Sequence, residues 1–158
     1  MLRLSVPYTG LILSTRESAG LRDELFGLGI SQVSAESRTS PGGYSASDKE
    51  EWDAQFNVGD QRSLDEVIGS LISTGSIPSF CAACYRKERT GEAFMGLARP
   101  GTIKGKCSFN ALVTLKEYLD DFASVPVREA GYRLIRNVSL SLEKEELTRL
   151  ESFFDDIN

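Results

Sequence analysis

The cysteines of this chain constrain its fold more than any other feature. Cys81, Cys84 and Cys107 have the spacing C-x2-C-x22-C, and the 158 residues contain neither a fourth cysteine nor a histidine. A Cys-x-x-Cys pair can direct two sulfurs at one metal from a single turn, and a third thiolate brought back by a helical segment completes a three-thiolate face. The fourth coordination position then stays open, which a reactive iron-sulfur cluster needs and a structural zinc site avoids.

Two other interpretations of the cysteines stay open on spacing alone. Free cysteines are often small buried hydrophobic residues, and zinc with an Asp or Glu as its fourth ligand also suits three thiolates. The local sequence favours ligation, because Pro78 precedes the first pair and Pro100, Gly101 and Gly105 precede the third cysteine. Such residues allow tight backbone paths around a metal centre.

The composition excludes several classes of partner. A net charge of -5 argues against nucleic-acid binding, and no stretch approaches the roughly 18 consecutive apolar residues of a membrane-spanning helix. The first residues are too quickly interrupted, by Pro7, to form a secretory signal. We therefore expect a cytoplasmic protein with no nucleic-acid or membrane partner. In that compartment clustered cysteines indicate metal or redox chemistry rather than disulfides.

Residues 1–45 have the pattern of one βα unit of a parallel sheet. The sequence predicts strands at 8–14 and 30–35, with a helix between them that Ser18 caps and Gly29 ends. Two strands can neither close a barrel nor satisfy their own edges. We therefore expect this segment to be the end of a larger domain, and the chain to be a fragment or to need a partner.

Two polar residues follow the predicted strands at the end where α/β barrels carry their catalytic residues. Arg16 and Ser34 could together bind a carboxylate, the arginine through its guanidinium and the serine through its hydroxyl. A structural salt bridge of Arg16 with Glu17 or Glu36 is the simpler alternative.

The rest of the chain is predicted to be a linker at 46–62 and a helical domain at 63–158. Ser63 and Glu66 form a capping box that starts a helix ending near Gly75. Further helices are predicted at 91–98, at 110–123, from about 126 onward and at 142–154.

The sequence resembles a known family from about residue 4 to residue 136. The resemblance is carried by YTGLILSTRES, GISQVSAESRTSPGGYS, QFNVGDQRSLDEVI, CAACYRKERTGEAFMGLA and the pattern C-S-F-N-A-L-x-T-x-K-E-Y-L-x-D-F-A. These segments are similar to the C-terminal third of the tyrosine-cleaving radical S-adenosylmethionine (SAM) maturases of FeFe-hydrogenase. The thiamine-pathway tyrosine lyase shares the first two segments, but C-x2-C-x22-C marks the second cluster of the maturases.

The resemblance implies a fold and a function. The α/β fold would be the last βα unit of a radical SAM (β/α)8 barrel at 1–45, followed at 63–158 by a mainly α-helical, BATS-like auxiliary cluster domain. Cys81, Cys84 and Cys107 would bind an auxiliary 4Fe-4S cluster with a labile extra iron. The parent enzyme would cleave L-tyrosine with a SAM-bound 4Fe-4S cluster and make carbon monoxide and cyanide for the hydrogenase H-cluster. Arg16 and Ser34 would hold the tyrosine carboxylate.

Several parts of the family pattern are absent from the sequence. The C-x3-C-x2-C loop, the SAM contacts, most of the barrel and the histidine that helps hold the labile iron have no counterpart. We therefore expect the chain alone to be inactive, with the missing N-terminal radical SAM barrel and a hydrogenase maturation scaffold protein as partners. The alternatives are a non-catalytic zinc- or cluster-binding scaffold module and a remnant of the thiamine-pathway tyrosine lyase, 2-iminoacetate synthase.

Overall fold

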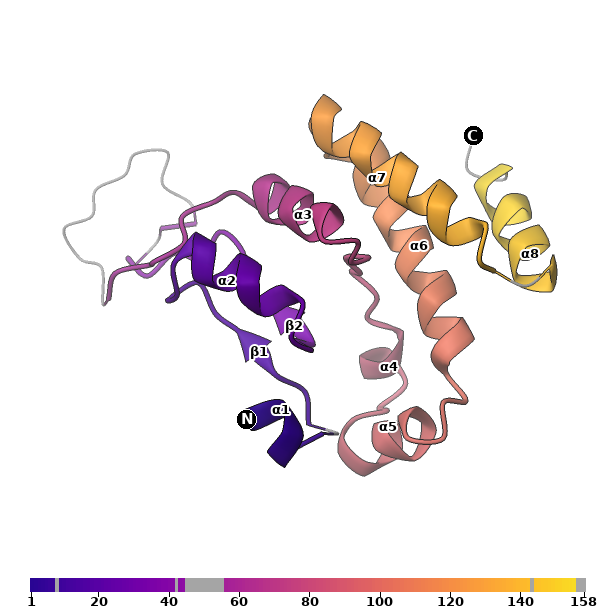
Figure 1. Cartoon of the computed structure of the whole chain (residues 1–158), viewed down its shortest axis with the longest axis horizontal. Coiled ribbons are helices and arrows are strands. Elements are labelled where there is room, and N and C mark those ends of the chain that lie inside the picture. The colour runs from indigo at the N-terminus through magenta and orange to yellow at the C-terminus, as the bar shows by residue number, and fades with distance from the viewer. Residues whose placement is uncertain (8, 42, 45–55, 143, 156–158) are drawn as a thin grey trace. The chain divides into compact units, whose positions relative to one another are not determined.

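The structure is a computed structural model that describes residues 1–7, 9–41, 43–44, 56–142 and 144–155. It is mostly helical, with one small sheet (Figure 1). The chain divides into two compact units, Met1–Ser70 and Leu71–Asn158. Residues 45–55, which include most of the predicted linker at 46–62, lie outside the described part. The predicted domains at 1–45 and 63–158 stay predictions.

The first unit contains the predicted strand, helix and strand. Strands β1 (Ile12–Leu13) and β2 (Gln32–Val33) pair in parallel, with Ile12 opposite Gln32 and Leu13 opposite Val33. Helix α2 (Ala19–Phe26) connects them, and the short helix α1 (Leu2–Ser5) precedes them. Parallel pairing across a helical connection confirms the βα unit. Both strands are shorter than predicted, because regular pairing is limited to two residues of each.

Local capping explains where α2 begins and ends. The Ser18 hydroxyl accepts a hydrogen bond from the Leu21 N–H (3.4 Å), as predicted for an N-cap. The helix ends at Phe26, before the predicted position. Gly29 follows with a φ of 82°, a left-handed conformation that suits glycine and redirects the chain toward β2.

Helix α3 (Leu64–Ser73) starts with the predicted capping box. The Glu66 carboxylate accepts the Ser63 N–H (2.8 Å), and the Ser63 hydroxyl accepts the Glu66 N–H (3.3 Å). The hydrogen bond from the Ser63 backbone N–H to the Glu66 carboxylate lowers the pKa of Glu66. Gly75, with a φ of 77°, follows the helix end as predicted.

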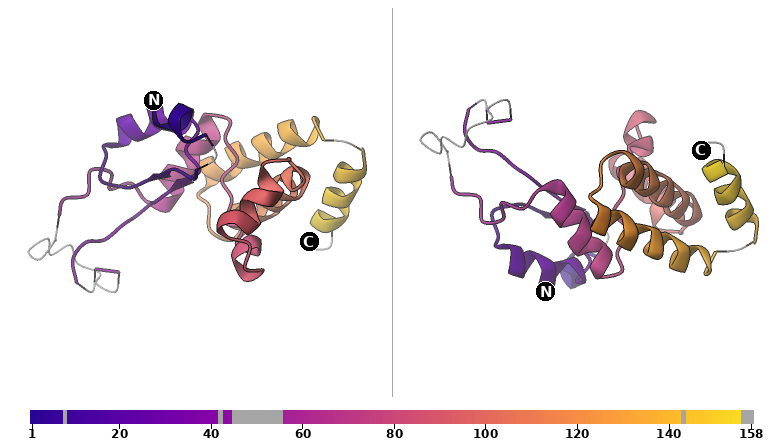
Figure 2. Two further views of the ribbon diagram at one scale, coloured as in Figure 1. Left: turned by 90° about the horizontal axis from the view of Figure 1, so that it is seen from below. Right: turned by 90° about the horizontal axis from the view of Figure 1, so that it is seen from above.

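The second unit consists of helices (Figure 2). The helices are α4 (Ala83–Arg86), α5 (Gly91–Ala98), α6 (Lys104–Asp121), α7 (Val125–Ser139) and α8 (Lys144–Asp155). Helix α5 has the predicted bounds. Helix α6 begins six residues before the predicted start at 110, so Cys107 lies inside it rather than in a preceding loop.

Helix α6 packs against both α7 and α8. Its residues Leu112, Leu115 and Leu119 have no exposed surface. Close approach of α7 requires a glycine, because a Cβ at Gly131 would lie 2.5 Å from the Leu119 methyl carbons. At the α8 contact, the rings of Phe109 and Phe153 meet edge to face with their centroids 5.9 Å apart. Within the described residues, no helix combines the length and apolar character needed to cross a membrane.

Candidate metal centre

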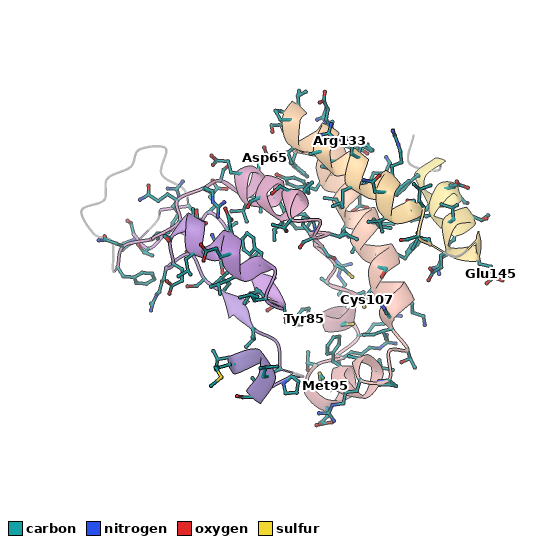
Figure 3. All side chains as sticks on the ribbon, viewed as in Figure 1. Asp65, Tyr85, Met95, Cys107, Arg133 and Glu145 are labelled. Carbon is teal, nitrogen blue, oxygen red and sulfur yellow. The ribbon has the colours of Figure 1, made fainter. Side chains whose placement is uncertain are left out.

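The three cysteines lie on adjoining parts of the second unit. Cys81 is in the loop before α4, and Cys84 is in α4. Cys107 is in the first turns of α6 (Figure 3). All three thiols are free; Cys81 and Cys107 are exposed, and Cys84 is half-buried. The Cys84 carbonyl accepts hydrogen bonds from the Lys87 and Arg89 N–H groups (3.1 and 2.9 Å), which close the turn after α4.

The other two cysteines act electrostatically on the Cys107 thiol. Partial burial of the Cys107 thiol raises its pKa, and the charges of Cys84 and Cys81 raise it further. Three thiolates brought together therefore repel, and a cation between them removes that cost. Six exposed basic residues lie between Cys84 and Cys107 in the sequence: Arg86, Lys87, Arg89, Arg99, Lys104 and Lys106.

The donor set suits a metal centre, although the sulfurs are not gathered at ligand distance. Among the described residues, no three His, Cys, Asp or Glu side chains form a group that could hold a metal ion as placed. Cys81 is on a loop, Cys84 is on a helix of only four residues and Cys107 is on α6, so three separate segments would supply the ligands. Thiolate ligands suit both zinc and iron-sulfur clusters. The ligand assignment stays a prediction.

Arg16 and Ser34 follow β1 and β2 in the first unit. The exposed Arg16 guanidinium lies over the Phe56 ring, with its carbon 4.1 Å from the ring centroid. The half-buried Ser34 donates its N–H to the Leu13 carbonyl (3.0 Å), continuing the strand pairing. Both residues thus leave the sheet at the same end, as parallel pairing dictates. Their proposed role in binding a carboxylate stays a prediction.

A buried network of charges lies beside these strand ends, and the sequence did not indicate it. The side chains of Arg22 and Asp60 are paired and fully buried. Arg62 donates to both Asp60 oxygens (Nε–Oδ1 3.0 Å, Nη2–Oδ2 2.8 Å) and to Asp23 (Nη1–Oδ1 3.0 Å). Arg22 also donates to the Ser34 carbonyl, so the network ties β2 to α2.

The network holds Asp60 as a carboxylate. Burial alone would raise the pKa of Asp60, but hydrogen bonds from Arg62, together with the hydrogen bond and charge of Arg22, outweigh burial and lower it to about 2. The hydrogen bond to Asp60 is in turn the main cause of a raised pKa at Arg62. Asp60 also donates its N–H to the Thr15 carbonyl (2.9 Å), which links the network to the end of β1.

Acid should weaken the first unit through Asp60. Because the folded pKa is lowered from 3.8 to about 2, the stabilisation is fully present above the unfolded value and is lost as the pH falls through the folded one. We expect a loss of about 2 kcal/mol across that window. Carbon-detected NMR titration of the Asp60 carboxyl measures its pKa directly, and a value of 3.8 or higher contradicts the prediction.

The first half of the chain matches a known protein family. The family described as the Biotin and Thiamin Synthesis associated domain (BATS) matches residues 1–77. This match differs from our expectation of a BATS-like domain at 63–158. The 2-iminoacetate synthases of Salmonella typhimurium strain LT2 and Escherichia coli strain K12 are 45% and 42% identical to the chain over 76 residues. Those matches cover 48% of this chain and 20% of each relative.

Solved structures extend the likeness to nearly the whole chain. A crystal structure of HydG, a maturase of FeFe-hydrogenase, matches 99% of the chain with 39% identity and a TM-score of 0.87. The chain matches the C-terminal part of HydG. HydG of Carboxydothermus hydrogenoformans matches 97% of the chain with 36% identity and a TM-score of 0.66.

The HydG likeness includes the segment that carries the cysteines, because it extends over both units. By contrast, the two synthases match only about half of the chain. The chain spans 34% and 31% of the two HydG chains and 20% of the synthases. The likeness to HydG therefore covers more of this chain than the likeness to the two synthases does.

Proposed function

We propose that this chain is the auxiliary-cluster part of a radical SAM tyrosine lyase that makes carbon monoxide and cyanide for the hydrogenase H-cluster. Cys81, Cys84 and Cys107 are its three cluster ligands. The observation that carries the proposal is the 39% identity to HydG across 99% of the chain, which includes all three thiols. When bound, the 4Fe-4S cluster supplies an open coordination position and a labile extra iron.

The chain's own residues have two tasks in this proposal. In the second unit, the loop and α4 present Cys81 and Cys84 while α6 presents Cys107. In the first unit, β1, α2 and β2 are the last βα unit of the parent's barrel, and Arg16 and Ser34 hold the tyrosine carboxylate at its rim. The parallel register of β1 and β2 supports this placement.

The proposal includes partners that lie outside this chain. A SAM-binding barrel with its own 4Fe-4S cluster performs the cleavage of L-tyrosine, and a hydrogenase maturation scaffold protein receives the product. This chain alone is inactive, because the radical-generating motif is not in its sequence. Three free thiols fit a reducing, cytoplasmic location.

Anaerobic reconstitution with iron and sulfide tests the cluster assignment. We expect about four irons and four sulfides per chain. Replacing one ligand, Cys84→Ala, should abolish binding of the cluster, because two thiolates cannot hold it. Iron, acid-labile sulfide and zinc are measured by elemental and colorimetric analysis, and the reduced cluster by electron paramagnetic resonance.

Ala82→Ser is a matched control for the reconstitution. Ala82 is an exposed residue between the two cysteines of the motif, so this variant alters the same loop without removing a thiol. It should bind iron and sulfide as the wild type does. Stoichiometric zinc without sulfide in the wild type would instead identify a zinc-binding scaffold module. Undiminished iron and sulfide in Cys84→Ala would exclude Cys84 as a ligand.

A further inference from the structure

One face of α6 holds the loop that carries Cys81. Asn110, Thr114 and Tyr118 follow one another at intervals of four residues, so they form a single stripe on the helix. Each contacts the segment Phe80–Cys81. The Asn110 side-chain amide donates to Cys81 Sγ (3.5 Å), the Thr114 hydroxyl accepts the Phe80 N–H (3.2 Å), and the Tyr118 ring stacks on the Phe80 ring with centroids 5.3 Å apart.

These contacts define how the loop aligns with the helix. The Thr114 hydroxyl gives its hydrogen to the Asn110 carbonyl (2.9 Å), which leaves its lone pairs to accept from Phe80. The Cys81 N–H donates to the Ser79 hydroxyl (3.2 Å), so the backbone beside the thiol is also hydrogen-bonded. The hydrogen bond between Phe80 and Thr114 aligns the loop so that Cys81 lies beside Asn110. Asn110 is about one turn of α6 after Cys107.

An amide N–H directed at a ligand sulfur has a chemical effect on any centre that the sulfur binds. It stabilises negative charge on the thiolate, and hydrogen bonds to cluster sulfurs help to set the reduction potential. A hydrogen bond from the amide N–H to the sulfur favours the reduced state of the cluster, because that state carries more negative charge. Removing the N–H should therefore make the potential more negative.

We propose that Asn110 is a positioning residue for Cys81 that also tunes the potential of the bound cluster. The inference rests on the proposed function, because it requires Cys81 to be a ligand. It adds a residue beyond the three thiols, and it identifies the α6 stripe as the element that sets where the first ligand lies. The amide N–H, rather than the bulk of the side chain, has the tuning role.

Redox titration of the reconstituted chain tests this role, monitored by electron paramagnetic resonance of the reduced cluster. Asn110→Leu removes the donor at similar size, and it should keep the wild-type iron content while shifting the midpoint potential to a more negative value. Asn110→Gln keeps an amide donor and should return the potential toward the wild type. Asn137→Leu, the same change at an exposed asparagine of α7, is the control and should leave the potential unchanged.

The outcomes separate this inference from the proposed function. A wild-type chain that takes up no cluster overturns both. A cluster in Asn110→Leu with wild-type potential overturns the role of Asn110 alone. Asn110→Leu could lose iron while its circular dichroism stays that of the wild type. In that case, retention of iron by Asn110→Gln supports the role of the N–H. Loss of iron in both variants overturns it.

Discussion

Asp60→Ala should destabilise the first unit by about 3–5 kcal/mol, the usual cost of removing one partner from a buried ion pair. The side chain of Arg22 has no exposed surface, so without Asp60 its charge remains buried and uncompensated. Arg62 would also lose its main partner. Urea unfolding followed by circular dichroism measures the overall loss. Hydrogen exchange of the Ser34 amide, which donates to the Leu13 carbonyl, assigns it to this unit.

Glu24→Ala is the matched control for the loss of Asp60. Glu24 is an exposed carboxylate on α2, the helix that also carries Arg22, and its removal should change the free energy of unfolding by less than about 0.5 kcal/mol. A double variant, Arg22→Met with Asp60→Ala, should lose less than the two single changes added together, because neither charge is then left alone. An Asp60→Ala chain as stable as the control would show that the pair contributes little.

Gly59→Ala should cost about 3 kcal/mol, at the upper end of the usual range for overpacking. A Cβ at this position would lie 2.3 Å from the Arg16 carbonyl oxygen and 2.9 Å from the Glu17 carbonyl group. Both neighbours are main-chain atoms, which cannot rotate away as a side chain can. The backbone after β1 must therefore move, and this movement disturbs the hydrogen bond from the Asp60 N–H to the Thr15 carbonyl. Thermal and urea unfolding measure the change.

Replacing Gly20 by alanine should have the opposite effect and increase the free energy of unfolding. Gly20 lies within α2, and a Cβ there meets nothing within 4 Å. Alanine is favoured over glycine in a helix by about 1 kcal/mol, so Gly20→Ala should stabilise the first unit. Equal stabilities of the two variants would contradict the close contact at Gly59.

Local signals in the sequence predicted the elements that depend on neighbouring residues. Ser18 caps α2 and Ser63 with Glu66 caps α3, because each cap involves groups within three residues. The early start of α6 was missed because residues 104–110 lack an apolar helical stripe and include Gly105. Contacts with α8 stabilise this first part of α6, where the helix propensity of the sequence is low. The rings of Phe109 and Phe153 meet there.

The buried charges were missed because pairing between distant residues leaves no local pattern. Arg22 and Asp60 are 38 residues apart, and charged residues are ordinarily expected to be solvated. The structure shows that Arg22 and Phe26, four residues apart, are both buried, so the buried face of α2 carries a charge that requires a partner. For the cysteines, the spacing predicts a ligand set, but spacing does not encode the hydrogen bond from Asn110.

The early start of α6 links ligand binding to folding. One continuous helix carries Cys107 near its beginning and the fully buried Leu112, Leu115 and Leu119 farther along. A group that binds only when Cys107 is helical therefore adds its binding free energy to the stability of the helical core. By the same thermodynamic cycle, any change that loosens the packing of α6 against α7 weakens the affinity for that group, even though the altered residue never touches it.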